Sequence, residues 1–313
     1  MCGILTILDL SGINIAKAIK SLSILEKRGP DYTHYDIFNN LFIGQTTLEI
    51  SGKYSKNNFV SESNNFIISF NGEIYNSKLN NDTKYLINMF DNKSHSEIID
   101  EINGMYCFCV YDKVNNTLTM TRDMIGEKVI YYYKKNGIFI VSSEILPIIN
   151  YLGKYNLDEN ELQNYFLTRH LMQFENTLFK DIYTVLPGES IIVDISNLNI
   201  ISRNVKDIRS MISKEKQNEL SSRSYKELNT ILNDIFKEVI IEMTPKIKFA
   251  CVISGGIDSS LSTALISKNV KPDLCVACYC ENKDFVASKD MGVYENSINN
   301  NIDVINVTPK EWA

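Results

Sequence analysis

The second residue of the chain is a cysteine, Cys2, which directly follows Met1. If Met1 is removed, Cys2 carries a thiol with a pKa of roughly 8.5 and a free α-amine with a pKa of roughly 8. The amine can then accept the thiol proton, so that one residue supplies both nucleophile and base. Position alone is equally satisfied by a cysteine that only begins a buried strand. The residue type therefore makes Cys2 a candidate nucleophile that needs further support.

Asn71 and Gly72 are candidates for stabilising an oxyanion. They open the hexapeptide 71–76 (NGEIYN), which follows a predicted strand at Phe66–Phe70. A side-chain amide and a backbone N–H at a strand end are the donors that a tetrahedral oxyanion requires, and glycine allows close backbone approach. Taken alone, Asn-Gly is also typical of a hairpin turn. Both interpretations remain open at this point.

A glycine-rich segment at 254–260 (SGGIDSS) lies between a predicted strand, Phe249–Ile253, and a predicted helix, Ser260–Lys268. Hydroxyl and N–H groups at a helix N-terminus form an anion site, and the glycines let the backbone approach a phosphate. The segment is not a Walker loop, because no Gly-Lys-Ser/Thr follows it. The alternative is a strand-to-helix turn without a ligand. The spacing favours phosphate binding.

Three clustered cysteines, Cys275, Cys278 and Cys280, raise the possibility of a metal or redox site. They lie in an apolar run that reads as a strand, where successive side chains alternate between faces. Only Cys278 and Cys280 share a face, and two thiols make an incomplete zinc site. We therefore expect buried core residues. The histidines are dispersed without ligand spacing, at His34, His95 and His170.

The first two hundred residues alternate short β-rich segments with few helices. An amphipathic pattern predicts a helix at Asn14–Leu25, and Asn, Gly and Lys turn signals separate the apolar runs. Predicted strands lie at 4–8, 41–50, 65–70, 105–111, 117–121, 129–133 and 138–142. Two packed sheets with helices outside would bury this many strands.

The pattern changes after about residue 202. Residues 203–222 are polar and rich in lysine and serine, as in a linker. A capping-box pattern at Ser224-x-x-Glu227 predicts a helix to about Met243. Strands at 249–253, 273–280 and 302–307 then alternate with helices, the last at about 284–299, which predicts a parallel sheet.

Composition limits the possible partners. The chain has 313 residues, a net charge of −6, 44% hydrophobic and 22% charged residues, which is typical of a soluble globular protein. An acidic chain does not favour nucleic acid as a partner. No apolar stretch approaches the roughly 18 residues that cross a bilayer. Seven scattered cysteines favour reduced thiols and a cytoplasmic location.

Several motifs together resemble the class II glutamine amidotransferases. They occur in the family's order: Met-Cys-Gly-Ile at the start, Arg28-Gly29-Pro30-Asp31, the hexapeptide 71–76, Gly104-Met105-Tyr106-x-Phe108 with Tyr111-Asp112, and Arg122-Asp123-x-x-Gly126. Ser143-Glu144 and Leu186-Pro187-Gly188 look like the glutamine-hydrolysing asparagine synthetase branch. The resemblance implies an α+β N-terminal-nucleophile sandwich of two antiparallel sheets with helices outside, as a glutaminase domain at residues 2–202.

The resemblance also implies residue roles. Cys2 would attack the glutamine carboxamide, and Asn71 with the Gly72 N–H would form the oxyanion hole. Glu73 and Asp82 stand where the family binds the α-amino group of the substrate, as suits anions that face a cation. Asp82 could instead be only a helix N-cap before 84–90.

One position departs from the family pattern. In the family an arginine binds the substrate α-carboxylate, and the matching stretch here, 45–50 (QTTLEI), places Thr47 at that position. A hydroxyl cannot replace a guanidinium fork, and one lost charge-assisted contact costs about 2 kcal/mol. Either another cation substitutes or glutamine binds poorly. A second, milder departure is the absence of the family's proline in Gly126–Tyr131.

The segment at 254–260 resembles the pyrophosphate loop of ATP pyrophosphatases, which adenylate a carboxyl or carbonyl oxygen. The resemblance implies a partial α/β ATP-binding domain at residues 223–313 and Mg²⁺ near Asp258. The implied ATP-binding residues are Ile253, Ser254, Gly255, Gly256, Asp258 and Ser259. The family's second signature, Ser-Gly-Glu-Gly-x-Asp-Glu, does not occur in this chain.

The resemblance as a whole implies an asparagine synthetase that uses glutamine, aspartate and ATP. Ammonia released at Cys2 would amidate an aspartyl adenylate, with AMP and pyrophosphate as further products. Two alternatives stay open: amidation of another carboxylate, and a non-catalytic nucleotide-binding homologue. The expected partners beyond substrates are a second copy in a homodimer or a separate chain that completes the synthetase domain.

Overall fold

The computed structural model describes residues 2–49, 61–79, 81–171, 175–245, 247–254, 256–280 and 302–307. The chain divides into two compact units, Met1–Ser213 and Lys214–Ala313. The segment 203–222, predicted as a linker, contains the end of a strand, a short 3-10 helix at Ile208–Met211 and a helix at Lys214–Ser221.

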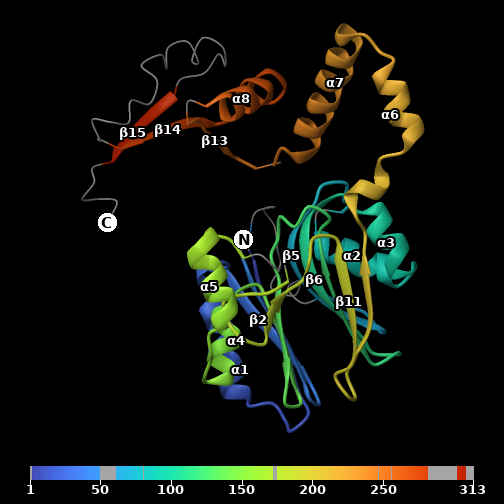
Figure 1. The fold of residues 1–313 in the computed structure, drawn as a ribbon, viewed down its shortest axis with the longest axis vertical. Coiled ribbons are helices and arrows are strands. Elements are labelled where there is room, and N and C mark those ends of the chain that lie inside the picture. The colour runs from blue at the N-terminus through green and yellow to red at the C-terminus, as the bar shows by residue number, and fades with distance from the viewer. Residues whose placement is uncertain are drawn as a thin grey trace. The chain divides into compact units, whose positions relative to one another are not determined.

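The first unit contains two six-stranded antiparallel sheets (Figure 1). The first sheet has the order β10-β8-β9-β1-β3-β2, with strands Ile182–Thr184, Tyr131–Lys135, Ile138–Ser142, Gly3–Asp9, Leu41–Thr47 and Tyr32–Phe38. The second has the order β12-β11-β7-β6-β5-β4, with strands Ile200–Val205, Glu189–Asp194, Thr117–Arg122, Gly104–Asp112, Phe66–Ile74 and Ser61–Glu62.

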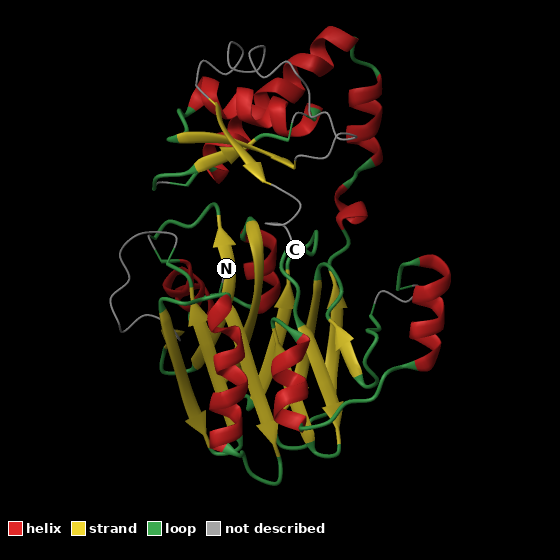
Figure 2. Ribbon diagram, turned by 90° about the vertical axis from the view of Figure 1, so that its left-hand side faces the viewer, coloured by secondary structure: helices red, strands yellow, loops and turns green. Residues whose placement is uncertain are grey.

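Helices cover the outer faces of both sheets (Figures 1 and 2). The helices α1 (Ile15–Ser23) and α4 (Ile145–Leu152) pack on the first sheet. The helix α2 (Asp82–Phe90) packs on the second sheet, next to α3 (His95–Glu101). A further helix, α5, spans Glu159–Thr168. The layers therefore run helix, sheet, sheet, helix.

Three apolar clusters hold these layers together. Ile4 and Leu41 of the first sheet meet Cys109 and Met120 of the second between the sheets. A second cluster joins the first sheet to α1 and α4, and a third joins the second sheet to α2 and α3. Each sheet buries both faces, which explains why β1 and β3 read as continuous apolar runs rather than as alternating patterns.

The structure confirms the predicted strands at 4–8, 105–111, 117–121 and 138–142 with small shifts at their ends. The predicted helix at Asn14–Leu25 ends earlier, at Ser23, where a 3-10 turn at Ile24–Lys27 continues the chain. Asn14 is its N-cap and accepts a hydrogen bond from the Lys17 N–H at 3.0 Å.

The segment around Asn71 departs from the prediction. The strand does not end at Phe70, because β5 continues through Ile74 and pairs with β6 along its whole length. Asn71 faces Cys107 and Gly72 faces Tyr106 in this ladder. The hairpin-turn interpretation of Asn-Gly is therefore wrong: pairing with a neighbouring strand overrides the local turn preference.

The second unit contains a three-stranded parallel sheet in the order β13-β14-β15, with strands Ala250–Val252, Leu274–Cys280 and Ile302–Val307. The helices are α6 (Lys214–Ser221), α7 (Tyr225–Met243) and α8 (Ile257–Asn269). The predicted capping box forms, with Ser224 and Glu227 exchanging hydrogen bonds. The predicted fold class, an antiparallel sandwich followed by a partial parallel sheet, is confirmed. The predicted helix at 284–299 lies outside the described residues.

Cys275 is fully buried and faces Cys251 across the ladder, as expected for a core residue. The side chains of Cys278 and Cys280 lie outside what the structure describes. Within the described part of the chain no group of three His, Cys, Asp or Glu residues could hold a metal ion. No helix in that part is long and apolar enough to cross a membrane.

His95 gives a testable consequence of the core. Its ring packs near Phe90 and Phe108, and Nε2 lies 3.0 Å from the Thr121 hydroxyl oxygen. Burial lowers the pKa of His95 from 6.5 to about 4. Between about pH 6.5 and pH 4, His95 is therefore protonated in the unfolded state but neutral in the folded state. This difference stabilises the unfolded state, so the free energy of unfolding decreases as the pH falls from 6.5 toward 4.

We expect the wild type to lose about 1 to 2 kcal/mol more unfolding free energy between pH 7 and pH 5 than His95→Gln does. Urea unfolding followed by circular dichroism at the two pH values measures this difference. An equal loss in both proteins would contradict the assignment.

Candidate active site

Cys2 lies at the start of β1, where Arg28 holds its backbone. Arg28 Nε donates to the Cys2 carbonyl oxygen at 3.0 Å, and Arg28 NH1 pairs with Glu144 Oε1 at 3.2 Å. The Cys2 thiol points toward the Leu48 carbonyl oxygen, 4.0 Å away. Burial raises the pKa of the Cys2 thiol, and the positive charges of Lys128 and Arg28 act in the opposite direction. The thiol therefore needs a nearby base to ionise at neutral pH.

The loop from Arg28 to Asp31 runs directly along β3. Pro30 forms a bridge with Thr47, and the Asp31 N–H donates to the Thr47 carbonyl oxygen at 3.1 Å. At Gly29 an added Cβ would lie 2.4 Å from the Thr47 nitrogen. Only glycine allows this approach, which places the loop against the residues that flank Cys2.

Asn71 lies in the interior of β5 and is 1% exposed. Its Nδ2 donates to Cys107 Sγ at 3.6 Å, and the Cys107 thiol donates in turn to the Val129 carbonyl oxygen at 3.7 Å. The Asn71 Oδ1 has no hydrogen-bond partner among the described residues. Asn71 Nδ2 carries two N–H groups, and the bond to Cys107 uses one of them, so the amide can also donate to an anion.

The free edge of β5 carries a row of backbone donors. The Phe70 N–H donates to Gln45 Oε1 at 2.9 Å, and the Ile74 N–H donates to Asp82 Oδ2 at 3.0 Å. Both bonds leave β5 on the side away from β6. Because alternate N–H groups of a strand point to the same side, the Gly72 N–H faces this edge too, between the other two. Gly72 thus offers a donor beside Asn71, as an oxyanion hole requires.

Close strand pairing makes glycine necessary at this position. Gly72 has a φ of 155°, and an added Cβ would lie 2.1 Å from the Met105 carbonyl oxygen. A side chain here would push β5 away from β6 and move Asn71 and Glu73 with it. The backbone geometry of the candidate oxyanion hole therefore depends on Gly72 both for its φ angle and for its close contact with β6.

Glu73 and Asp82 form a small acidic cluster. Burial raises the pKa of Glu73, and the charge of Asp82 raises it further; burial also raises the pKa of Asp82. Asp82 is not the N-cap of α2, because Asn81 caps it by accepting from the Lys84 N–H at 2.8 Å. That alternative is corrected. Two partly buried carboxylates whose pKa values are both raised are suited to binding a cation.

Thr47 supplies no charge to this region. It is 3% exposed, and its hydroxyl oxygen accepts from Gln45 Nε2 at 3.3 Å. Gln45 also accepts from β5, so Thr47 belongs to a polar bridge between the two sheets. An anionic substrate group needs a cation from elsewhere.

Lys128 is a residue that sequence analysis missed. It is 7% exposed and follows a tight loop held by Asp123, whose carboxylate accepts N–H groups of Gly126, Glu127 and Lys128 at 2.6, 2.9 and 2.9 Å. The motif Arg122-Asp123-x-x-Gly126 indicated this loop, but the burial of Lys128 could not be predicted from the motif.

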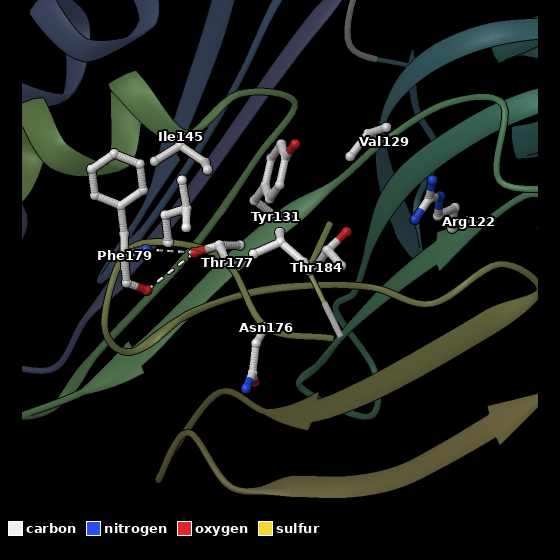
Figure 3. Close-up of a pocket in the computed structure, with 10 residues that line it drawn as sticks. Arg122, Val129, Tyr131, Ile145, Asn176, Thr177, Phe179 and Thr184 are labelled. Carbon is white, nitrogen blue, oxygen red and sulfur yellow. Dashed lines mark hydrogen bonds between the residues drawn. The ribbon is translucent and has the colours of Figure 1, made fainter. Parts of the chain in front are cut away.

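A separate cavity of about 340 Å³ lies beyond Arg122 (Figure 3). Its lining is mostly apolar or hydroxyl-bearing, including Tyr131, Thr177 and Phe179. Arg122 donates to the carbonyl oxygens of Val185 and Gly126 at 2.8 and 2.6 Å. Neither Cys2 nor Asn71 lines this cavity, so it is distinct from the candidate site.

In the second unit, hydroxyl groups meet at the start of α8. The Ser254 and Ser259 hydroxyl oxygens are 3.0 Å apart, and the Ser254 N–H donates to Ser259 Oγ at 3.2 Å. Gly256 is the N-cap, Asp258 lies in the first turn, and Ile253 is buried below them. Gly255 lies outside the described residues. The arrangement presents exposed hydroxyl groups and a helix N-terminus to solvent.

Residues 1–203 match the glutamine amidotransferase domain family. A Methanocaldococcus jannaschii protein named as a glutamine-hydrolysing asparagine synthetase is 25% identical over 246 residues, which cover 74% of this chain and 41% of that protein. Asparagine synthetase 3 of Bacillus subtilis is 25% identical over 259 residues, 77% of this chain and 41% of the relative.

The chain thus spans less than half the length of these relatives. Among solved structures, the glutamine phosphoribosylpyrophosphate amidotransferase of B. subtilis aligns with 97% of this chain and 65% of its own, with a TM-score of 0.44 and 12% identity.

Gly72 provides a direct test of the site's backbone. We expect Gly72→Ala to cost about 3 kcal/mol of unfolding free energy, because the Cβ clashes with β6 and the backbone angle is strained. Gly137→Ala is the matched control: it has a φ of 74° but its Cβ would meet nothing nearer than 3.8 Å, so it should cost about 1 kcal/mol. Chemical denaturation measures both. Equal losses would contradict the packing argument.

Proposed function

This chain belongs to the glutamine amidotransferase domain family, and we propose that it releases ammonia from L-glutamine with Cys2 as the nucleophile. The observation that carries the proposal is the family match over residues 1–203 together with a cysteine at position 2, braced by Arg28. The donor row on the free edge of β5 supports it.

These residues can carry out both the formation and the hydrolysis of a thioester. The free α-amine of processed Cys2 accepts the thiol proton, and the sulfur attacks the carboxamide carbon of glutamine. The oxyanion that forms would accept from the Gly72 N–H and the Asn71 amide, which strand pairing holds in place. Collapse of this intermediate breaks the C–N bond, the amine returns its proton to the departing nitrogen, and ammonia leaves a thioester. Water then attacks the thioester and releases glutamate.

The acidic cluster supports recognition of an amino acid. Glu73 and Asp82 would bind the α-ammonium group of glutamine. A cation between them offsets the burial that raises both pKa values and the charge of Asp82 that raises the pKa of Glu73 further. The substrate thereby enters with its carboxamide end toward Cys2.

We further propose that the second unit binds ATP at 253–259. Hydroxyl groups of Ser254 and Ser259 at the N-terminus of α8 fit a phosphate. Asp258 is the candidate for holding Mg²⁺, with phosphate oxygens and water as its other ligands. When bound, ATP supplies an adenylyl group that turns a carboxylate into an electrophile.

Asparagine formation from aspartate is the acceptor reaction that the relatives' names favour. Ammonia from Cys2 would displace AMP from the activated aspartate. An acceptor of another structure would use the same two steps.

The nucleophile is tested by glutamate release from glutamine. Wild-type protein, with Met1 removal checked by mass, should release glutamate, and Cys2→Ala should lose at least about a thousandfold because no thiol remains to attack. Cys251→Ala removes a buried thiol of the second unit, in β13, and should keep the activity because Cys251 contributes nothing to the candidate glutaminase site. Retention of activity in Cys2→Ala would exclude this mechanism.

The nucleotide site is tested by calorimetry with Mg-ATP. Ser254→Ala combined with Ser259→Ala should weaken ATP binding about 10- to 100-fold, because two hydroxyl donors to an anion are lost. Lys268→Ala, at the exposed C-terminal end of α8, is the control and should bind like wild type. Equal ATP affinity in the double variant and the control would contradict the site.

A further inference from the structure

We propose that Lys128 binds the α-carboxylate of glutamine and takes the role that Thr47 cannot fill. The inference rests on the proposed glutaminase function and assigns a substrate contact within that site. Glutamine is a zwitterion at neutral pH, so its pocket needs a cation for the carboxylate as well as anions for the ammonium group.

The other cations near the site are already engaged. Arg28 donates to the Cys2 carbonyl oxygen and pairs with Glu144. Arg122 donates to two backbone carbonyl oxygens, those of Val185 and Gly126. Withdrawing either guanidinium for a ligand would leave these acceptors without their donors. Both arginines are therefore structural in this arrangement.

Lys128 differs from them. It is 7% exposed, and among the residues that the structure describes its ammonium group has no hydrogen-bond or ion-pair partner. A charge that is mostly shielded from solvent interacts more strongly with an opposite charge than an exposed one does. Such a group gains strongly from an anionic ligand. Its burial makes a solvated surface role inconsistent with the structure.

A chain of contacts places Lys128 beside the candidate oxyanion hole. The carbonyl oxygen of its neighbour Val129 accepts from the Cys107 thiol, and Cys107 Sγ accepts from Asn71. The positive charge of Lys128 lowers the pKa values of both Cys2 and Glu73, which agrees with an ammonium group that lies within reach of both residues. The Asp123 carboxylate fixes the loop from which Lys128 projects.

Lys128 and Glu73 together offer the two charges that an amino acid needs. Lys128 and Glu73 influence each other electrostatically, yet they form no ion pair within the described structure. A pair in direct contact would neutralise itself and leave nothing for a ligand. In glutamine the ammonium and carboxylate groups share one carbon atom, so the pocket needs a cation and an anion that are close but apart. Lys128 and Glu73 meet that condition.

The test measures binding of L-glutamine and of its α-methyl ester, which lacks only the negative charge of the carboxylate. A Cys2→Ala background prevents turnover, and calorimetry gives the Kd of each ligand. With Lys128 present, glutamine should bind about 10- to 100-fold more tightly than the ester. In Cys2→Ala/Lys128→Met this preference should disappear, and in Cys2→Ala/Lys128→Arg most of it should remain.

The control is Lys134→Met in the same background, which removes an exposed lysine of β8 and should leave the preference unchanged. If Lys128→Met weakens both ligands equally, or leaves the preference intact, the inference is overturned. Alkylation of Cys2 by iodoacetamide tests whether Lys128 acts only on the thiol. If Lys128→Met changes the alkylation rate but not the preference for glutamine over its ester, the inference is also overturned.

These outcomes separate the inference from the proposed function. If the wild type releases glutamate but the preference for glutamine over its ester does not depend on Lys128, the glutaminase function stands and the inference about Lys128 is wrong. If the preference depends on Lys128 but the wild type releases no glutamate, the inference about Lys128 stands and the proposed glutaminase activity is wrong.

Discussion

At Gly72 the backbone of β5 approaches β6 so closely that a Cβ atom would lie 2.1 Å from the Met105 carbonyl oxygen. This pairing keeps β5 straight through Asn71, Gly72 and Glu73, and it directs alternate N–H groups to the free edge. Gln45 and Asp82 take the first and last of these donors, which leaves the Gly72 N–H between them. The register of β5 on β6 thus positions the donors of the candidate oxyanion hole, which lie on a strand and not on a loop. Preorganised donors of this kind stabilise developing charge without a reorganisation cost at the moment of reaction.

Charges are buried around this strand in an arrangement that suits a zwitterion. Glu73 and Asp82 lie on one side with raised pKa values, and Lys128 lies near Glu73 without pairing with it. Arg28 serves a different purpose, since its bonds to Cys2 and Glu144 fix the start of β1. A bound amino acid would compensate the charges of these groups together. We infer that substrate binding and stability of this region are linked, because a ligand that binds only the folded state stabilises it.

Much of the fold could be predicted from the sequence, for reasons that concern particular residues. β6 and β9 carry uninterrupted apolar runs, and the helix after Ser224 carries its capping box in its sequence. The edge strand β2 was missed because its residues are only partly buried and include His34 and Asp36. The predicted strand that ends at Phe70 is shorter than β5 because Asn-Gly favours a turn locally, whereas pairing with β6 keeps these residues in the strand. Asn81 and Asp82 are both good caps, so their order could not be resolved. Within the site, Cys2 and Gly72 could be singled out by type and position. Lys128 could not, since lysine is usually exposed and only tertiary packing buries it.

We expect Cys2 to form a covalent intermediate with glutamine, which mass spectrometry can detect directly. Protein quenched in acid during turnover should carry one γ-glutamyl group on the N-terminal peptide that contains processed Cys2, and Cys2→Ala should carry none. Glutamate release without this adduct at any quench time, or a glutamyl group on another residue, would contradict the account.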